Sequence, residues 1–187
     1  KKDEFDFSWM DEIIDKLYNA GIYVNLATPS GARPHWLANE DPEVWRVGDD
    51  GLCYPDLAEE LDIISWDSYP YWHTPNNNII EAYRESFTHD YIRGLKKQPF
   101  LLMECTPSTV NWRPVSKMKK PGMHRLAVLN AIGHGSESGL YFQIRQSRGS
   151  AEKMHSAVIS HVGTENTRVF REVSMLGADM EKKSKKI

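Results

Sequence analysis

The stretch from Pro99 to Pro107 constrains the fold of this chain more than any other. The four apolar residues 100–103 have the length and composition of a strand that is buried on both faces. Glu104 follows at the carboxyl end of that strand, and a loop comes next. In a parallel α/β barrel, the carboxyl ends of the strands carry the catalytic side chains. Glu104 is therefore either a catalytic carboxylate or a strand-end residue that caps a helix or pairs with an arginine.

The rest of the chain alternates helices with short apolar strands, which is the pattern of an α/β fold. Apolar residues at helical spacing predict the helices, and short apolar runs followed by long loops predict the strands. The predicted helices cover residues 10–20, 78–97, 122–134 and 165–183, and the predicted strands cover residues 22–27, 62–67, 100–103 and 139–144. A complete (β/α)₈ barrel has eight strand–helix units. Since the sequence predicts four strands, we expect roughly half of such a barrel.

The charge and the cysteines argue against several classes of partner. The chain has 23 basic and 26 acidic residues, and its net charge of −3 favours neither nucleic acid nor an anionic membrane. No apolar run approaches the roughly 20 residues of a transmembrane helix, and no secretory signal opens the sequence. Cys53 and Cys105 are not spaced like metal ligands. We therefore expect free thiols, a reducing cytoplasmic compartment and no metal.

Several longer stretches resemble the catalytic domain of glycoside hydrolase family 42 β-galactosidases. They follow the order of the family and occupy residues 7–14, 26–29, 65–70, 102–108, 111–112, 120–124, 141–143 and 145–155. That family has a TIM barrel, with an acid/base carboxylate after strand 4 and a nucleophilic carboxylate after strand 7. The resemblance therefore implies a partial (β/α)₈ TIM barrel in which the four predicted strands match strands 2, 6, 7 and 8.

The same resemblance implies roles for individual residues. It makes Glu104 the nucleophile and places Tyr69 beside it. The side chains that match the galactose subsite of the family are Trp112, Phe142, Glu152 and His155. Independently of the family, a nucleophilic carboxylate must be ionised, which requires hydrogen-bond donors or a nearby cation. Tyr69 is the candidate donor, and Arg33 is the candidate cation among the substrate-binding residues.

Two of these assignments have alternatives. Glu152 and His155 are three residues apart, so they share one face of a helix or a tight turn and can both bind sugar hydroxyls. The same spacing occurs in di-metal helical bundles, but the chain has no second carboxylate–histidine set in register. Trp112 is either a platform on which galactose stacks or a loop tryptophan packed onto the barrel. We expect no metal and no cofactor.

The sequence departs from the family at one catalytic position. The acid/base glutamate of the family lies in an Asn-Glu pair, and the only such pair here, Asn39 with Glu40, belongs to the loop after the first predicted strand. The segment that carries strands 3 to 5 is missing between about residues 51 and 57. We therefore expect residues 1–187 to form a single, incomplete barrel domain with a discontinuity at that place.

Three functions are compatible with these observations. The first is the catalytic domain of a retaining β-galactosidase, which removes terminal non-reducing β-D-galactose through a covalent galactosyl-enzyme on Glu104. The second is a catalytically silent remnant that binds galactosides but lacks the acid/base. The third is a small α/β binding domain, which leaves four retained catalytic-face loops unexplained. A β-galactoside is the expected partner, and the family resemblance implies a homo-oligomer, often a trimer.

Overall fold

The computed structural model describes residues 6–26, 58–59, 61–72 and 78–184. The chain separates into two units, Lys1–Cys53 and Tyr54–Ile187, which are considered one at a time. In the first unit the described residues form one helix, α1 (Ser8–Asn19), close to the helix predicted over residues 10–20. None of the residues of α1 is buried, so its apolar face has no cover within the described part of this unit.

The strand predicted over residues 22–27 does not form over its described part, residues 22–26. A strand exists only when a neighbouring strand accepts and donates its backbone hydrogen bonds. The described residues of the first unit contain no such neighbour, and Tyr23 in the middle of the segment is 88% exposed. The prediction is therefore wrong for residues 22–26.

The second unit contains two parallel strands, β1 (Ser65–Asp67) and β2 (Leu101–Glu104). Both lie where the sequence predicts strands. In the register of the pair, Asp67 lies opposite Glu104, after an irregularity at the preceding residue. Since parallel strands end at the same edge of a sheet, this pairing brings the two carboxylates to one edge.

Residues 136–142 run along the other side of β2, where the sequence predicts a strand over residues 139–144. The structure forms only isolated parallel bridges there, Phe100 with Ser136 and Cys105 with Tyr141. Between these bridges the Leu102 N–H donates to the Ser136 hydroxyl at 3.0 Å, where a continuous ladder would use a backbone carbonyl. Residues 143–146 then bond to residues 158–159 instead of continuing along β2. A broken ladder thus replaces the predicted strand.

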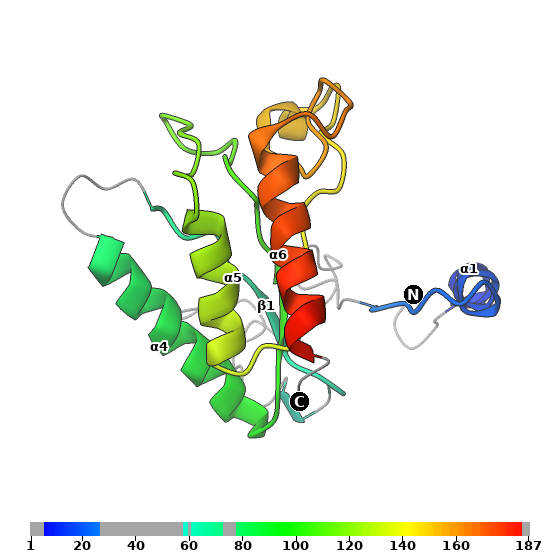
Figure 1. The fold of residues 1–187 in the computed structure, drawn as a ribbon. Coiled ribbons are helices and arrows are strands. Elements are labelled where there is room, and N and C mark those ends of the chain that lie inside the picture. The colour runs from blue at the N-terminus through cyan, green and yellow to red at the C-terminus, as the bar shows by residue number, and fades with distance from the viewer. Residues whose placement is uncertain (1–5, 27–57, 60, 73–77, 185–187) are drawn as a thin grey trace, which may run out of the picture. The chain divides into compact units, whose positions relative to one another are not determined.

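Three helices cover one face of this sheet and lie side by side (Figure 1). They are α4 (Asn78–Lys96), α5 (Met123–Gly133) and α6 (Arg168–Ser184). Helix α5 packs against both α4 and α6. All three correspond to predicted helices. Across the described residues, no helix combines the length and apolar character needed to cross a membrane.

The core lies between the strands and the helices as two apolar clusters that share Trp66. The first cluster joins β2 to α5 and α6, and its buried members are Leu102, Cys105, Val128, Ala131 and Leu176. The second joins the residues directly before β1 and β2 to α4, and its buried members are Ala58, Ile64, Ile92 and Phe100. Burying one such large apolar side chain contributes about 1.5–3 kcal/mol. These clusters therefore fix the position of β2, and with it the position of Glu104.

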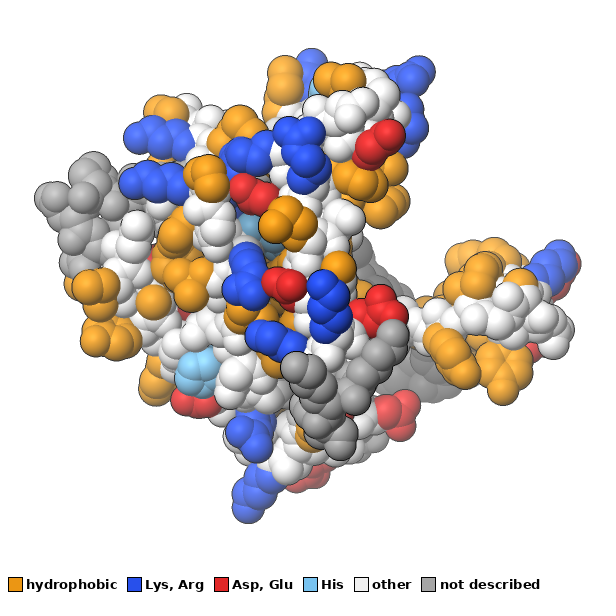
Figure 2. Space-filling model, viewed as in Figure 1, with side chains coloured by type: hydrophobic (Ala, Val, Ile, Leu, Met, Phe, Trp, Pro, Cys, Tyr) orange, Lys and Arg blue, Asp and Glu red, His pale blue; other side chains and the backbone are white. Residues whose placement is uncertain are grey.

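Helix α4 presents most of its apolar side chains to solvent. Ile79, Tyr83 and Phe87 are four residues apart and so share one helical face, and they are 65%, 70% and 74% exposed. The buried residues of α4 are His89 and Ile92. Figure 2 shows hydrophobic side chains gathered at the left of the view, where α4 runs. The apolar repeat that predicts this helix therefore does not mark its sheet-facing side.

This exposed face leads to a prediction for a polypeptide of residues 1–187 alone. We expect it to bind the dye ANS at neutral pH and to unfold without a sharp transition, because an apolar stripe and an open strand edge destabilise a compact state. Fluorescence titration and thermal circular dichroism measure both properties. Replacing Ile79, Tyr83 and Phe87 with Gln should reduce ANS binding without loss of helical signal. A sharp cooperative melt of the unaltered polypeptide would contradict the prediction.

Candidate active site

The site is built around a hydrogen bond between two neighbouring strand ends. Glu104 is the last residue of β2 and is half-buried, and Tyr69 follows β1 by two residues. The Tyr69 hydroxyl donates to Glu104 Oε2 at 2.5 Å. The backbone N–H of Ser68 donates to the Glu104 carbonyl at 2.9 Å and ties the same two segments together. Burial, and then the hydrogen bond with Glu104, raises the pKa of Tyr69, so the phenol stays protonated and remains a donor.

Four aromatic side chains from separate segments meet beside this bond. The Tyr69 ring lies edge-on to Trp112, with ring centroids 4.9 Å apart, and edge-on to His155 at 5.7 Å. Phe142 lies edge-on to His155 at 4.9 Å, and Trp112 lies 5.4 Å from His155. The structure therefore brings together four residues that the sequence analysis assigns to one site.

Glu152 and His155 lie in and directly after the short 3₁₀ helix η2 (Ala151–Met154). The fully buried His155 places Nδ1 3.3 Å from Asn111 Oδ1 and 3.7 Å from Glu152 Oε2. Burial lowers the pKa of His155, although the charges of Glu152 and Glu104 oppose that shift. Within the described part of the chain, His155 Nε2 and Glu152 Oε2 are buried without a hydrogen-bond partner, so both can bind a ligand hydroxyl.

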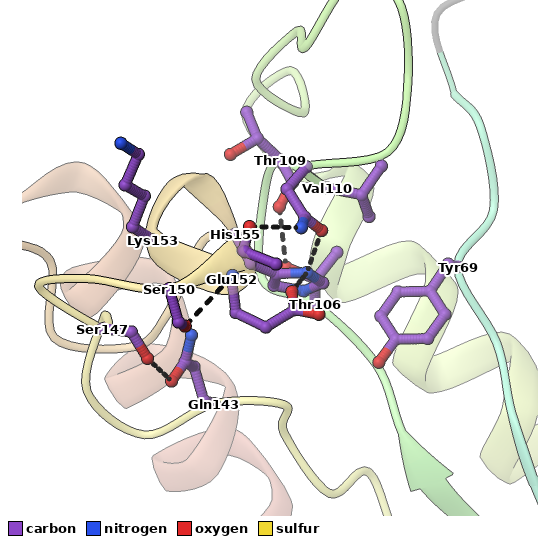
Figure 3. A network of polar contacts seen from close by, with 12 residues as sticks. Tyr69, Thr106, Thr109, Val110, Gln143, Ser147, Ser150, Glu152, Lys153 and His155 are labelled. Atoms are coloured by element: carbon purple, nitrogen blue, oxygen red, sulfur yellow. Dashed lines mark hydrogen bonds and ion pairs between the residues drawn. The ribbon is translucent and has the colours of Figure 1, made fainter. Parts of the chain in front are cut away.

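The loop after β2 holds η2 in this place. The Asn111 side-chain amide donates to the Ala151 carbonyl at 2.9 Å, and the Ser156 N–H donates to the Thr109 carbonyl at 2.9 Å. Figure 3 shows Thr109 and Val110 of this loop next to His155, with Tyr69 on the side away from Ser147 and Ser150. The sequence analysis does not assign Asn111 to the site. The sequence feature that could have identified Asn111 is its position next to Trp112, in a stretch that resembles the family.

Asp67 is a second residue that the sequence analysis does not assign to the site. It ends β1 directly opposite Glu104 in the parallel register. Desolvation, with a smaller contribution from the Glu104 charge, raises the pKa of Asp67 to about 6. The signal for it in the sequence was its position at a strand end, two residues before Tyr69. The edge of the sheet thus carries two carboxylates, and the charge of Glu104 contributes to the raised pKa of Asp67.

Some sequence predictions lie outside the described residues. Arg33, the candidate cation, is one of them, as are Asn39 with Glu40 and the predicted discontinuity near residues 51–57. Of the two cysteines, Cys105 is described and is a buried free thiol whose pKa burial raises to about 12. Over the described ranges, no three His, Cys, Asp or Glu side chains gather as metal ligands would.

Comparison with known proteins identifies a family. The family model described as Beta-galactosidase, for glycoside hydrolase family 42, matches residues 1–54 and 51–183. The β-galactosidase BglY of Alicyclobacillus acidocaldarius is 52% identical over 132 residues, which are 71% of this chain and 19% of that protein. The β-galactosidase GanA of Bacillus subtilis is 50% identical over 135 residues, which are 72% of this chain and 20% of that protein. The chain thus spans about a fifth of the length of these curated relatives.

Solved structures give the same result. A catalytic mutant of Gan42B, a family 42 β-galactosidase from G. stearothermophilus, superposes with a TM-score of 0.69 at 51% identity, covering 72% of this chain and 20% of that chain. The cold-adapted β-galactosidase from Rahnella sp. R3 superposes with a TM-score of 0.72 at 29% identity, covering 97% of this chain and 49% of that chain. These neighbours are TIM-barrel enzymes, and this chain belongs to their family, glycoside hydrolase family 42.

Proposed function

We propose that this chain carries the nucleophile side of the catalytic site of a retaining β-galactosidase, with Glu104 as the nucleophile. One observation carries the proposal: a strand-end carboxylate accepts a hydrogen bond from Tyr69 next to a cluster of aromatic rings. Family membership supports the choice of substrate, because the relatives are named β-galactosidases.

In this mechanism Glu104 attacks the anomeric carbon and forms a galactosyl-enzyme, which water then hydrolyses. Attack requires the ionised carboxylate, and a donor to one of its oxygens favours that form. Tyr69 donates to Oε2, which leaves Oε1 of Glu104 for the attack. Because the phenol stays protonated, it can support the carboxylate across the neutral pH range.

The neighbouring side chains suit a hexose. Trp112 is 51% exposed and can offer its ring to the C–H face of the sugar. His155 Nε2 and Glu152 Oε2, which are buried atoms without a hydrogen-bond partner among the described residues, can bind sugar hydroxyls. Phe142 contacts the His155 ring and holds its orientation. Arg33 remains the proposed cation of the site.

The acid/base must come from elsewhere. A retaining enzyme uses two carboxyl groups about 5–5.5 Å apart that flank the scissile bond from opposite sides. Asp67 does not meet this requirement, because it ends the strand next to Glu104 and lies on the same wall. We propose that the complete protein, meaning the whole gene product that contains these residues, supplies the acid/base from barrel segments absent here. The described strands would then match strands 6 and 7, and the break would fall near residues 51–57, where the two family matches meet.

The first test of this proposal replaces Glu104 with Gln in the complete protein. The amide keeps the shape of the side chain but cannot attack, so turnover of an aryl β-galactoside should fall by several orders of magnitude. The loss should appear mainly in kcat, because Trp112, Glu152 and His155 remain in place. Glu137→Gln, an exposed Glu→Gln change away from the site, is the matched control and should keep full activity. Turnover of Glu104→Gln at the control level would remove Glu104 from the nucleophile role.

Azide then distinguishes the nucleophile from the acid/base. In Glu104→Ala or Glu104→Gly a small anion can occupy the cleared space and displace the leaving group once, so the product should be the α-galactosyl azide. Loss of an acid/base would give the β product instead. NMR of the product determines the configuration, and a β-azide would contradict the assignment. Absence of any galactosidase activity in the complete wild-type protein would favour the silent galactoside-binding remnant.

The pair of carboxylates gives a prediction about pH. The pKa of Asp67 in the folded protein, about 6, is above its ordinary value of 3.8. The folded state thus binds more protons than the unfolded state between these values, and Asp67 lowers stability as pH rises from about 4 to 6. Asp67→Asn should remove this loss. We therefore expect the substitution to raise the free energy of unfolding of the complete protein more at pH 7 than at pH 4. The difference should be on the order of 1 kcal/mol, because water screens the group.

Urea denaturation at the two pH values measures this difference. In the Glu104→Gln background the effect of Asp67→Asn should become smaller, since the charge of Glu104 is part of its cause. An effect of Asp67→Asn that is equal at pH 4 and pH 7 would contradict the prediction.

A further inference from the structure

A small cavity lies behind the strand ends, next to the core that β2 shares with α5. Leu102 and Val128, both members of that core, line one part of it. The ionisable and polar residues among its lining are Ser68, Glu85, His89, Cys105, Lys119, His124 and Asn130. None of them belongs to the set proposed to contact galactose. The cavity therefore poses a separate question, namely why the half-buried carboxylate of Glu85 and the buried ammonium of Lys119 lie there.

Lys119 connects the cavity to the loop that follows Glu104. Its side chain is buried, and Nζ donates to the Thr106 carbonyl at 2.6 Å. Its backbone N–H donates to Ser108 Oγ at 3.3 Å, and its carbonyl accepts from Arg168 at 2.8 Å. Arg168, the first residue of α6, thus fixes Lys119. Lys119 in turn holds Thr106 and Ser108 in the loop after Glu104.

Glu85 connects the same cavity to the end of β1. It projects from α4 and accepts a hydrogen bond from the Ser68 hydroxyl. The backbone N–H of Ser68 donates to the carbonyl of Glu104 at 2.9 Å. Tyr69, the donor to the Glu104 carboxylate, is the next residue along the chain. Glu85 therefore restrains the segment that positions the partner of Glu104.

These two charges have no competitor in the cavity. Burial lowers the pKa of His124 to about 3 and that of His89 to about 4, so both imidazoles are neutral near pH 7. Cys105 is a neutral thiol, since burial raises its pKa to about 12. Burial also lowers the pKa of Lys119 to about 8, and the charge of Glu85 opposes that shift. Burial raises the pKa of Glu85, and the Ser68 hydroxyl and the charge of Lys119 oppose that shift. Each of the two opposite charges thus compensates part of the desolvation of the other.

We propose that Glu85 and Lys119 are positioning residues that clamp the two strand-end loops together and so hold Tyr69 and Glu104 at hydrogen-bonding distance. As an account of catalysis this rests on the proposed function, in which Glu104 is the nucleophile. Neither residue touches the sugar. Their effect is geometric, and a displacement of about 1 Å at reacting atoms is enough to reduce a rate about 100-fold.

Lys119→Met in the complete protein tests the clamp. Met keeps an unbranched side chain of similar length but removes the charge and the donors to Thr106. We expect kcat for an aryl β-galactoside to fall about 100-fold with little change in KM, and Lys119→Arg to restore part of the loss. Lys120→Met is the matched control, because Lys120 is the exposed neighbour, and it should behave like the wild type.

Hydrogen exchange separates positioning from general loss of stability, and it does not depend on activity. In Lys119→Met the amides of the non-proline residues in 68–71 and 105–109 should exchange at least about 10-fold faster, while those of α5 and α6 stay protected. Glu85→Gln should produce the same local pattern. In the Lys119→Met background Glu85→Gln should reduce kcat by less than in the wild type, because both residues act as one unit.

The outcomes are decisive in each direction. Local acceleration confined to the two loops supports the clamp, even if the wild-type protein turns over no galactoside and the proposed function fails. Unchanged exchange in the loops, equal acceleration throughout α5 and α6, or an identical effect of Lys120→Met would overturn it. Full galactosidase activity of Lys119→Met would overturn the clamp while leaving the nucleophile assignment of Glu104 intact.

Discussion

The short parallel pairing of β1 with β2 is the constraint on which the site depends. Only a few residues on each strand take part, yet the register places Asp67 opposite Glu104 and brings the next segment, with Tyr69, alongside. A pairing this short is weak by itself. The apolar clusters around Trp66 hold it from the helix side, so packing behind the sheet determines the geometry in front of it.

The chemistry of the edge follows from placing carboxylates close together in partly desolvated surroundings. Glu104 accepts a hydrogen bond from the Tyr69 hydroxyl, whereas Asp67 has no such donor among the described contacts and desolvation raises its pKa. The two acids thus have different hydrogen-bond partners although they end neighbouring strands.

The exposed apolar surfaces have a single physical explanation in the family context. Helix α4 presents Ile79, Tyr83 and Phe87 to solvent, and α1 buries none of its residues within its own unit. Monomeric soluble proteins rarely leave such stripes uncovered. In a TIM barrel each helix packs between two neighbours, and this chain spans about a fifth of its curated relatives. A chain that carries only part of such a barrel would leave these helix faces without cover.

The sequence by itself determined the local features of this protein. Helical periodicity located α1, α4, α5 and α6, and the apolar run before Glu104 located β2. Such features depend on interactions between residues near one another in the chain. The role of Glu104 is a proposal that rests on both kinds of information.

Tertiary structure decided what depends on partners distant in sequence. The predicted strand at residues 139–144 became a set of isolated bridges, because residues 143–146 bond to residues 158–159 instead of continuing along β2. The segment 22–26 formed no strand without a neighbour among the described residues of its unit. The raised pKa of Asp67 and the burial of Lys119 are likewise invisible in sequence. Desolvation and strand pairing are set by the groups that surround a residue in space, and no local pattern encodes which groups those are.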